Sequence, residues 1–429
     1  MRSVNSETPK EVTKHEDSDQ GQRKAFRFYI YDIPELLNKN ITHCKFVQPF
    51  MCVDFQDRGF GSETFIDGFG EEISFRATSM FSIEMIIHNK LKTNRLRTYN
   101  PDEADLFYVP AYFGLLELCY KETTRKKFQV LRELFTNNVY FSSGKPHIST
   151  LGLLYVWMPP DVNLGAHFKK NGKQMLTFLT LESVQIESMD PLSEIVIPYP
   201  SYGHFLHSME RTLYTNPLQS RNIYILLPIG EQYYEHSKRR QLLTDVTTYT
   251  DLSYDYFMKE HINMTFDRVH YITRECPQVI TQHVIQWMQH SVFCLQPRGD
   301  TDSRKSFYDS LMSGCIPVMI PKSTNPYAFQ NLIDYEQFSV ILPFSYIDID
   351  TESIYDILYD IPRYKVISLH SNVRKIAQYL QYSVSDNEEV KEESDALQLI
   401  FMALSDRFKL PYDKKHLYNL HINHDNQYL

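Results

Sequence analysis

The sequence has no apolar run of about 18 residues, the length that a helix needs to span a bilayer, so we expect no membrane-spanning helix. Residues 1–25 are polar and charged and lack the apolar core of a signal peptide, which predicts a disordered tail. No cluster of His and Cys has the spacing of zinc ligands, and no internal repeat is found.

Basic residues are in deficit as well, because 44 Lys and Arg stand against 53 Asp and Glu, for a formal net charge of −9. A protein that reads nucleic-acid phosphates normally has a basic excess, so no nucleic-acid partner is expected. Apolar residues make up 42% of the chain, which is ample for a packed core. At 429 residues the chain exceeds one ordinary core and is expected to form two domains.

Cysteine is scarce, with six residues in the whole chain. Cys294 and Cys315 lie in predicted buried strands, where cysteine usually acts as an inert small hydrophobe. Cys44 and Cys52 flank a loop short enough for a disulfide, and a free pair is an equal alternative.

Short apolar runs alternate with helical patterns along the chain, which favours parallel α/β sheets. The first half predicts strands at Phe26–Tyr31, Ala104–Val109 and Leu151–Trp157, and helices near Phe75–Leu91 and Arg125–Asn137. The second half predicts strands at Ile223–Leu227, Val269–Ile272 and Val340–Leu342, and helices from Lys238, at Val279–His290, near Val373–Tyr382 and at Asp395–Phe408.

The stretch Ser291–Ile320 is the most informative part of the sequence. Val292–Leu295 is a short apolar run closed by a proline, which is typical of a buried parallel strand. A basic polar loop follows, and then a helix for which Ser303 is the expected N-cap. Gly314 suits the helix C-terminus, and Ile316–Ile320 predicts the next buried strand.

The chemistry of this stretch lies where the loop meets the helix. A helix N-terminus has unpaired N–H groups and a positive dipole end, and Arg298, Arg304 and Lys305 add cations beside it, so a diphosphate is the expected ligand. Asp309 lies about one and a half turns past Ser303, where a carboxylate can accept hydrogen bonds from a ribose diol. Together these groups predict a nucleotide-sugar site.

The same stretch resembles the donor-site motif of the exostosin-type glycosyltransferases, glycosyltransferase family 47, and is similar to the version in the plant xyloglucan galactosyltransferase-like branch. Roughly twenty positions match within one strand–loop–helix–strand block. Further segments resemble the family in the same order: Phe28–Asn38, Asp57–Gly61, Phe81–Asn89, Tyr99–Pro110, Leu181–Ser183, Ile197–Ser201 and Asn325–Phe329.

The resemblance implies an α/β fold of the GT-B type, in which two Rossmann-like domains face a cleft. We expect an acceptor-side domain over residues 26–205 and a nucleotide-sugar-binding domain over residues 206–372. The C-terminal helices, within residues 373–429, are expected to pack back on the first domain. Ligands of such folds bind at the carboxyl ends of the strands, here between the domains.

The resemblance also implies roles for single residues. Arg240 matches by position a family arginine that reaches the donor diphosphate, with a surface cation as the alternative. Arg304 and Lys305 would stabilise the diphosphate, and Arg298 would assist them or be a solvated loop residue. Asp309 would hold the ribose, or else be a helix-surface acid paired with a neighbouring base.

Family 47 enzymes are thought to invert the anomeric centre, which requires a base to take the proton of the acceptor hydroxyl. Plant-branch members usually carry Gly-Arg-Asp-His in the segment where this chain has Leu151–Trp157, with apolar residues in place of the Asp-His pair. The remaining candidate bases are Asp32, Glu182 and His204, each of which could instead be a structural hydrogen-bonding residue.

Two Asp-x-Asp triplets, Asp300–Asp302 and Asp348–Asp350, raise a metal-dependent alternative. In the other major glycosyltransferase fold, GT-A, such a triplet holds a divalent ion that neutralises the diphosphate. Here Arg304 and Lys305 can neutralise it, so we expect no metal and no cofactor. Asp300 would then shape its own turn.

We therefore expect an enzyme that moves a hexose, galactose or a related sugar, from a UDP-sugar to a hydroxyl of a polysaccharide or a glycoprotein glycan. Tyr112, Phe113 and Tyr202 are the expected stacking surfaces for the acceptor. One alternative is a catalytically impaired member that acts as a glycan-binding or partner subunit. A second alternative is a heparan-type glucuronyl or N-acetylglucosaminyl transferase.

The expected partners are the UDP-sugar, an oligosaccharide or polysaccharide acceptor and other glycosyltransferases in a homo- or hetero-oligomer. The resemblance implies a Golgi location. Family members are usually anchored there by an N-terminal helix, and residues 1–25 show no such segment. A soluble member and a chain without its anchor both fit this pattern.

Overall fold

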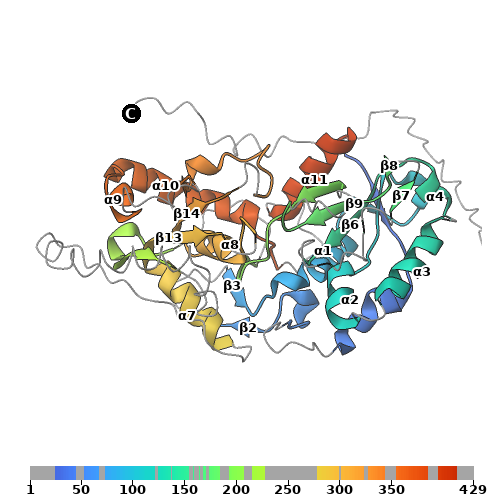
Figure 1. The fold of residues 1–429 in the computed structure, drawn as a ribbon, viewed down its shortest axis with the longest axis horizontal. Coiled ribbons are helices and arrows are strands. Elements are labelled where there is room, and N and C mark those ends of the chain that lie inside the picture. Colours follow the sequence, from blue (N-terminus) through green and yellow to red (C-terminus); the bar gives the residue numbers. More distant parts are fainter. Residues whose placement is uncertain are drawn as a thin grey trace, which may run out of the picture.

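The computed structural model describes residues 25–44, 53–66, 73–120, 124–136, 138–153, 158, 164, 168–170, 173–183, 193–206, 215–227, 278–298, 301–322, 327–343, 354–384 and 395–412. Most of the predicted tail over residues 1–25 lies outside this part of the chain. Two parallel sheets occupy opposite halves of an elongated molecule (Figure 1), which is the α/β architecture predicted for a GT-B fold. Among the described helices, none is long and apolar enough to cross a membrane.

The first sheet has six parallel strands in the order β10-β9-β6-β5-β1-β4. Their bounds are β1 Phe28–Ile30, β4 Arg97–Thr98, β5 Leu106–Tyr108, β6 His147–Leu151, β9 Thr177–Thr180 and β10 Ser193–Val196. The same half contains α1 (Ile83–Lys92), α2 (Phe113–Tyr120), α3 (Thr124–Thr136), α4 (Val139–Ser142) and the short hairpin of β7 (Lys169–Lys170) and β8 (Lys173–Gln174). Helix α1 buries Ile83, Ile86, Ile87 and Leu91, which helical spacing places on one face.

The second sheet has four parallel strands in the order β12-β13-β14-β15. Its elements are β12 Ile223–Leu226, β13 Ser291–Pro297, β14 Ile316–Ile320, β15 Val340–Ile341, α7 Gln278–Gln289, α8 Lys305–Met312, α9 Ile354–Tyr359 and α10 Arg363–Ile376. Every residue of β14 is buried, as an apolar strand inside a sheet covered on both faces requires. The elements predicted from Lys238 and at Val269–Ile272 lie outside the described residues.

A small antiparallel sheet, β11-β3-β2, lies between the two halves. Its strands are β2 Glu63–Thr64, β3 Ile73–Arg76 and β11 Gly203–Phe205. Figure 1 shows β2 and β3 between α7 and α2, and Ile66 and Phe75 share a buried cluster with Ile285 of α7. A larger buried cluster contains Phe28 of the first sheet and Phe293 of the second. The halves are therefore joined by a common core as well as by the chain.

The C-terminal helix α11 (Ala396–Phe408) packs on the first sheet. The ring of Phe401 lies 5.7 Å from that of Phe26 and 5.9 Å from that of Phe28, measured between centroids. At the start of the helix, Asp395 accepts a hydrogen bond from the Leu397 N–H and forms a 2.8 Å ion pair with Lys90 of α1. Breaking a buried pair by removing one partner costs about 3–5 kcal/mol, so this contact holds α11 firmly to the first half.

Three predicted elements differ from the structure. The helix predicted near Phe75–Leu91 is divided into the end of β3 and helix α1, and the strand predicted at Leu151–Trp157 lies earlier, as β6. The apolar pattern did not predict strand β6, because His147, Ser149 and Thr150 are polar. Each is hydrogen-bonded inside the sheet, with Tyr31, Val109 and Tyr108 respectively. The helix predicted near Val373–Tyr382 lies mostly earlier, as α10 (Arg363–Ile376), and a short 3-10 helix over Ala377–Leu380 follows it. The other strands and helices predicted within the described residues are confirmed.

Two disulfides differ from what the sequence predicted. Cys294 and Cys315 are bonded to each other, so the prediction of two inert hydrophobes was wrong. Cys44 is bonded to Cys119 and not to Cys52. Strands β13 and β14 are paired in parallel, which brings Cys294 and Cys315 together, and sequence spacing alone carries no trace of this proximity.

Candidate active site

The predicted strand–loop–helix–strand block is confirmed as β13, α8 and β14. Gly314 ends the helix with φ +68°, a left-handed conformation that glycine adopts without strain. A side chain there would also meet Thr215 and the guanidinium of Arg221 at less than contact distance. Arg221 is buried and donates to the carbonyls of Met288, Ser291 and Ser313, which fixes the ends of α7 and α8 beneath the block.

The N-cap of α8 is Arg304, so the prediction of Ser303 at this position was wrong. Arg304 has extended backbone angles, φ −152° and ψ 150°, and its side chain does not cap the helix. It donates instead to the Pro297 carbonyl at 3.4 Å, across the loop. Ser303 is buried one residue earlier, and its backbone amide lies beside the carboxyl group of Glu182, whose charged form it favours.

Side chains of the loop and of the strand end fix this helix start. Ser306 donates to Gln296 Oε1 at 2.6 Å, and Gln296 Nε2 donates back to the Ser306 carbonyl at 3.3 Å. Arg298 forms a 3.0 Å ion pair with Asp302, which also accepts the Lys322 N–H. Asp302 of the first Asp-x-Asp triplet thus ties the loop together. Asp300 and the second triplet lie outside the described residues.

Lys305, the first residue of α8, contacts two other residues closely. Its Nζ lies 3.1 Å from both carboxylate oxygens of Asp309 and 2.8 Å from the ring centroid of Tyr202. The Tyr202 backbone N–H donates to Asp309 Oδ1 at 2.8 Å. Burial lowers the pKa of Lys305 to about 8 and raises the pKa of Asp309.

These contacts differ from the roles predicted for Lys305 and Asp309, which were expected to bind the ligand. Asp309 does pair with a neighbouring base, but it is only 2% exposed, so it is not a surface acid. Lys305 and Asp309 neutralise each other, whereas Arg304 lies at the helix N-terminus itself. Arg304 is therefore the described cation best placed to meet a diphosphate beside the positive end of the helix dipole. Arg240 lies outside the described residues.

Glu182 follows β9 of the first sheet and reaches the loop of the second. Its carboxyl group accepts a 2.6 Å hydrogen bond from the Tyr199 hydroxyl, and the Thr301 side chain and the Ser303 backbone amide lie beside it and favour its charged form. Burial raises the pKa of Glu182 to about 7. Glu182 is thus a candidate base that lies against the loop between β13 and α8.

His204 in β11 is completely buried, and both ring nitrogens are engaged. Nδ1 lies 2.7 Å from the Tyr382 carbonyl and Nε2 lies 2.8 Å from the Thr78 hydroxyl. Burial lowers the pKa of His204 to about 3. These contacts favour a structural role. Asp32, the third candidate, follows β1 and is exposed.

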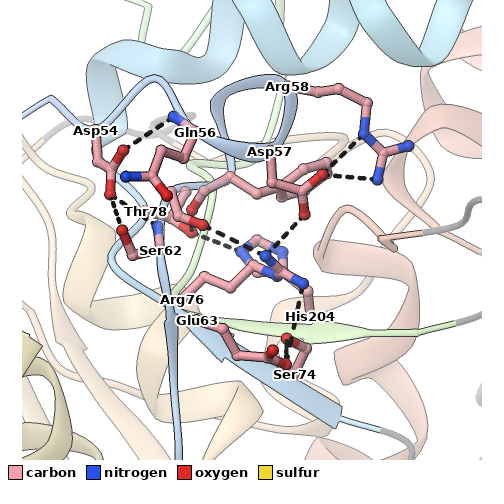
Figure 2. Close-up of polar contacts among 12 residues, drawn as sticks. Asp54, Gln56, Asp57, Arg58, Ser62, Glu63, Ser74, Arg76, Thr78 and His204 are labelled. Atoms are coloured by element: carbon pink, nitrogen blue, oxygen red, sulfur yellow. Dashed lines mark hydrogen bonds and ion pairs between the residues drawn. The ribbon is translucent and has the colours of Figure 1, made fainter.

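The segment Asp57–Gly61 forms a tightly folded loop next to His204 (Figure 2). Asp57 and Arg58 both have positive φ, 42° and 59°, which strains residues other than glycine. The Asp57 carboxylate joins two guanidinium groups, Arg58 at 3.0 Å and Arg76 of β3 at 2.7 Å (Figure 2). Gly61, at φ +87°, lies against the Ala77 carbonyl, where a side chain would clash.

The segment after β6 is held by a buried carboxyl group that the sequence did not single out. Glu84 of α1 accepts the N–H groups of Gly114 at 2.7 Å, Leu115 at 3.0 Å and Gly152 at 3.1 Å. It therefore caps the start of α2 and fixes the end of β6 together. Residues 154–157 lie outside the described residues.

Two of the three predicted stacking surfaces are closed to an acceptor, because Tyr112 and Phe113 are buried, at 4% and 0% exposed. Tyr202 is partly buried, and its ring covers the Lys305 ammonium. Within the described residues, no group of three or more His, Cys, Asp or Glu side chains could hold a metal ion.

Sequence reasoning missed Tyr199, Thr301, Gln296 and Arg221. Tyr199 lies within a quoted family segment, Ile197–Ser201, so its presence near the site could have been expected. The others act through contacts between strands and loops that are distant in sequence, for which single residues give no signal.

The family model described as the exostosin GT47 domain matches residues 22–348. A probable xyloglucan galactosyltransferase of Arabidopsis thaliana, GT20, is 27% identical over 332 residues, covering 73% of this chain and 55% of that protein. A second, GT17, is 26% identical over 315 residues and covers 70% and 65%. The chain thus spans less than two thirds of either relative.

A xyloglucan-specific galacturonosyltransferase of the same plant is 24% identical over 338 residues, which are 73% of this chain and 47% of that protein. Among solved structures, sucrose-phosphate synthase from Thermosynechococcus elongatus aligns over 77% of this chain and 78% of its own, with 10% identity and a TM-score of 0.36. This likeness is too weak to add to the fold described above. The match of the family model to most of the sequence is decisive, and this chain belongs to the exostosin GT47 family of glycosyltransferases.

Proposed function

We propose that this chain transfers a hexose, galactose or a related sugar, from a UDP-sugar to a glycan hydroxyl, with inversion and without a metal. The observation that carries the proposal is the start of α8, where Arg304 stands at the N-cap and the loop before it is fixed by Glu182, Gln296 and Asp302. Fixed N–H groups and a guanidinium at a helix start stabilise the charge that builds on a leaving diphosphate. The names of the Arabidopsis relatives support galactose as the transferred sugar.

A secretory-pathway location such as the Golgi lumen belongs to the same proposal. The disulfides Cys44–Cys119 and Cys294–Cys315 support it, because disulfides form and persist in oxidising compartments. The acceptor would be an oligosaccharide or polysaccharide, as for the relatives named after xyloglucan.

The test combines binding and turnover. UDP should raise the melting temperature in EDTA as much as in Mn²⁺, because the compensating charge is in the protein. UDP release should then occur with UDP-galactose and a xyloglucan oligosaccharide, and fail with UDP-glucuronic acid. No shift at millimolar UDP, or turnover that disappears in EDTA, would overturn the proposal.

A second function is favoured by one observation: the segment from Leu151 to Leu153 is apolar where plant-branch relatives are expected to carry polar Asp-His chemistry. A catalytically impaired partner subunit would bind UDP with the same preference but release no sugar from any donor in the panel. Binding without turnover, across several acceptors, would select this alternative.

A further inference from the structure

Glu182 links the two halves of the molecule at the donor loop. It follows β9 in the first sheet, and two of the three polar groups beside its carboxyl group, the Thr301 side chain and the Ser303 backbone amide, belong to the loop between β13 and α8. The third is the Tyr199 hydroxyl at 2.6 Å. The side chain is 5% exposed, so these polar groups take the place of water around the carboxyl group.

Burying the charged form of a carboxyl group in this position costs free energy unless nearby polar groups stabilise it. Burial disfavours its charged form, and Asp302 adds a like charge nearby, so both effects raise its pKa, to about 7. The charged form is favoured only by the three donors around it. One of them, Ser303, directly precedes Arg304, and Thr301 lies two residues before Ser303, so these contacts fix the loop just before the N-cap.

The contacts also differ from those of a general base. A base must direct a lone pair at the acceptor hydroxyl, within about 2.6–3.2 Å of its oxygen. The oxygens of Glu182 are directed at a phenol, a hydroxyl and a backbone N–H that all belong to the protein. Its neighbours are therefore structural groups, two of them in the loop between β13 and α8 and one, Tyr199, after β10.

We propose that Glu182 is a positioning residue, which holds Thr301 and Ser303 from the first half and so places Arg304 and the N-terminus of α8 for the donor diphosphate. This inference rests on the proposed function for its ligand, and on the structure alone for the contact between Glu182 and the loop. It assigns the carboxyl group to donor binding and leaves proton removal to another residue.

The first readout needs no ligand. Hydrogen exchange of a peptide that covers residues 298–307 should become at least tenfold faster in Glu182→Gln, because the Ser303 N–H loses its charged acceptor. Glu194→Gln is the matched control: Glu194 is a half-buried carboxylate on β10 of the same sheet, bound to Ser183 and not to the loop. Unchanged exchange in Glu182→Gln would overturn the positioning role, whatever the protein binds.

The second readout is UDP affinity by calorimetry. Glu182→Gln should weaken UDP about tenfold and Thr301→Val severalfold, and the double variant should be no weaker than Glu182→Gln alone, because both remove one contact. Glu182→Asp should restore part of the affinity. Wild-type UDP affinity in Glu182→Gln, with turnover reduced a thousandfold, would make Glu182 the base and overturn the inference. Faster exchange in a protein that binds no UDP would instead overturn the proposed function and keep the contact between Glu182 and the loop.

Discussion

Lys305 and Asp309 form a buried ion pair one turn apart on α8, with Nζ 3.1 Å from each carboxylate oxygen. Tyr202, from the segment that enters β11, completes the contact with its ring over the ammonium and its N–H on the carboxylate. The two charged residues were predicted to meet different parts of a nucleotide. In the structure they join α8 to the sheet β11-β3-β2, which lies between the two halves.

Breaking this pair from one side should destabilise the protein. Lys305→Met and Asp309→Asn should each lower the free energy of unfolding by about 3 kcal/mol, because one buried charge loses its partner. The double variant should lose clearly less than the sum of the two. Chemical unfolding of the four proteins measures this coupling, and strictly additive losses would show that the pair does not act as one unit.

Arg304 should matter for turnover far more than for stability. Arg304→Ala should lower kcat/KM, and the decrease should correspond to a loss of about 2–4 kcal/mol in transition-state stabilisation. This is the usual effect of removing one charge-stabilising donor. Lys39→Ala is the control, because Lys39 is an exposed cation paired with Glu35 far from α8 in sequence. Equal turnover in the two variants would reduce Arg304 to a surface cation.

The disulfide between Cys294 and Cys315 should stabilise the donor block by about 3 kcal/mol, the chain-entropy value for a loop of this length. Replacing both with Ala should lower the unfolding free energy by that amount and weaken UDP, since the bond connects β13 to the turn after α8. Replacing Cys44 and Cys119 should also destabilise the fold but leave UDP affinity unchanged. Equal UDP affinity in both double variants would show that the Cys294–Cys315 disulfide does not support UDP binding.

The sequence predicted strands and helix ends correctly where the local residue pattern alone determines the structure. The strands of Val292–Leu295 and Ile316–Ile320 are apolar runs inside a covered sheet, and Gly314 marks the helix end by its backbone freedom. Strand β6 was misplaced because its polar side chains find partners only across the sheet. Ser303 looked like a cap because serine often is one, but its N–H is used by a residue 121 positions earlier, which no local rule can anticipate.

In the candidate site, too, the sequence predicted which residues are present but not which contacts they make. The cations of the loop could be listed from the sequence, but their separate roles depend on distances. Lys305 is paired with Asp309 and Arg298 with Asp302, and only the folded chain shows that Arg304 occupies the N-cap of α8.

Glu84 should make stability depend on pH. Burial raises its pKa from an ordinary 4.5 to about 8, so the folded protein holds this proton more tightly than the unfolded chain. Its contribution to stability is therefore complete below pH about 4.5 and is lost as pH rises to about 8. Across that window the unfolding free energy should fall by at most about 1.4 kcal/mol per pH unit because of this group.

Glu84→Gln removes the titration but keeps the size of the side chain, so its unfolding free energy should fall less steeply over the same range. The variant should start less stable at low pH, because its amide group offers one oxygen to three backbone N–H groups. The difference between the two proteins should then narrow as pH rises. Glu103→Gln, an exposed carboxylate in the same half, should run parallel to the wild type throughout. Parallel curves for Glu84→Gln would mean that the three N–H donors fully offset burial and keep Glu84 charged at every pH tested.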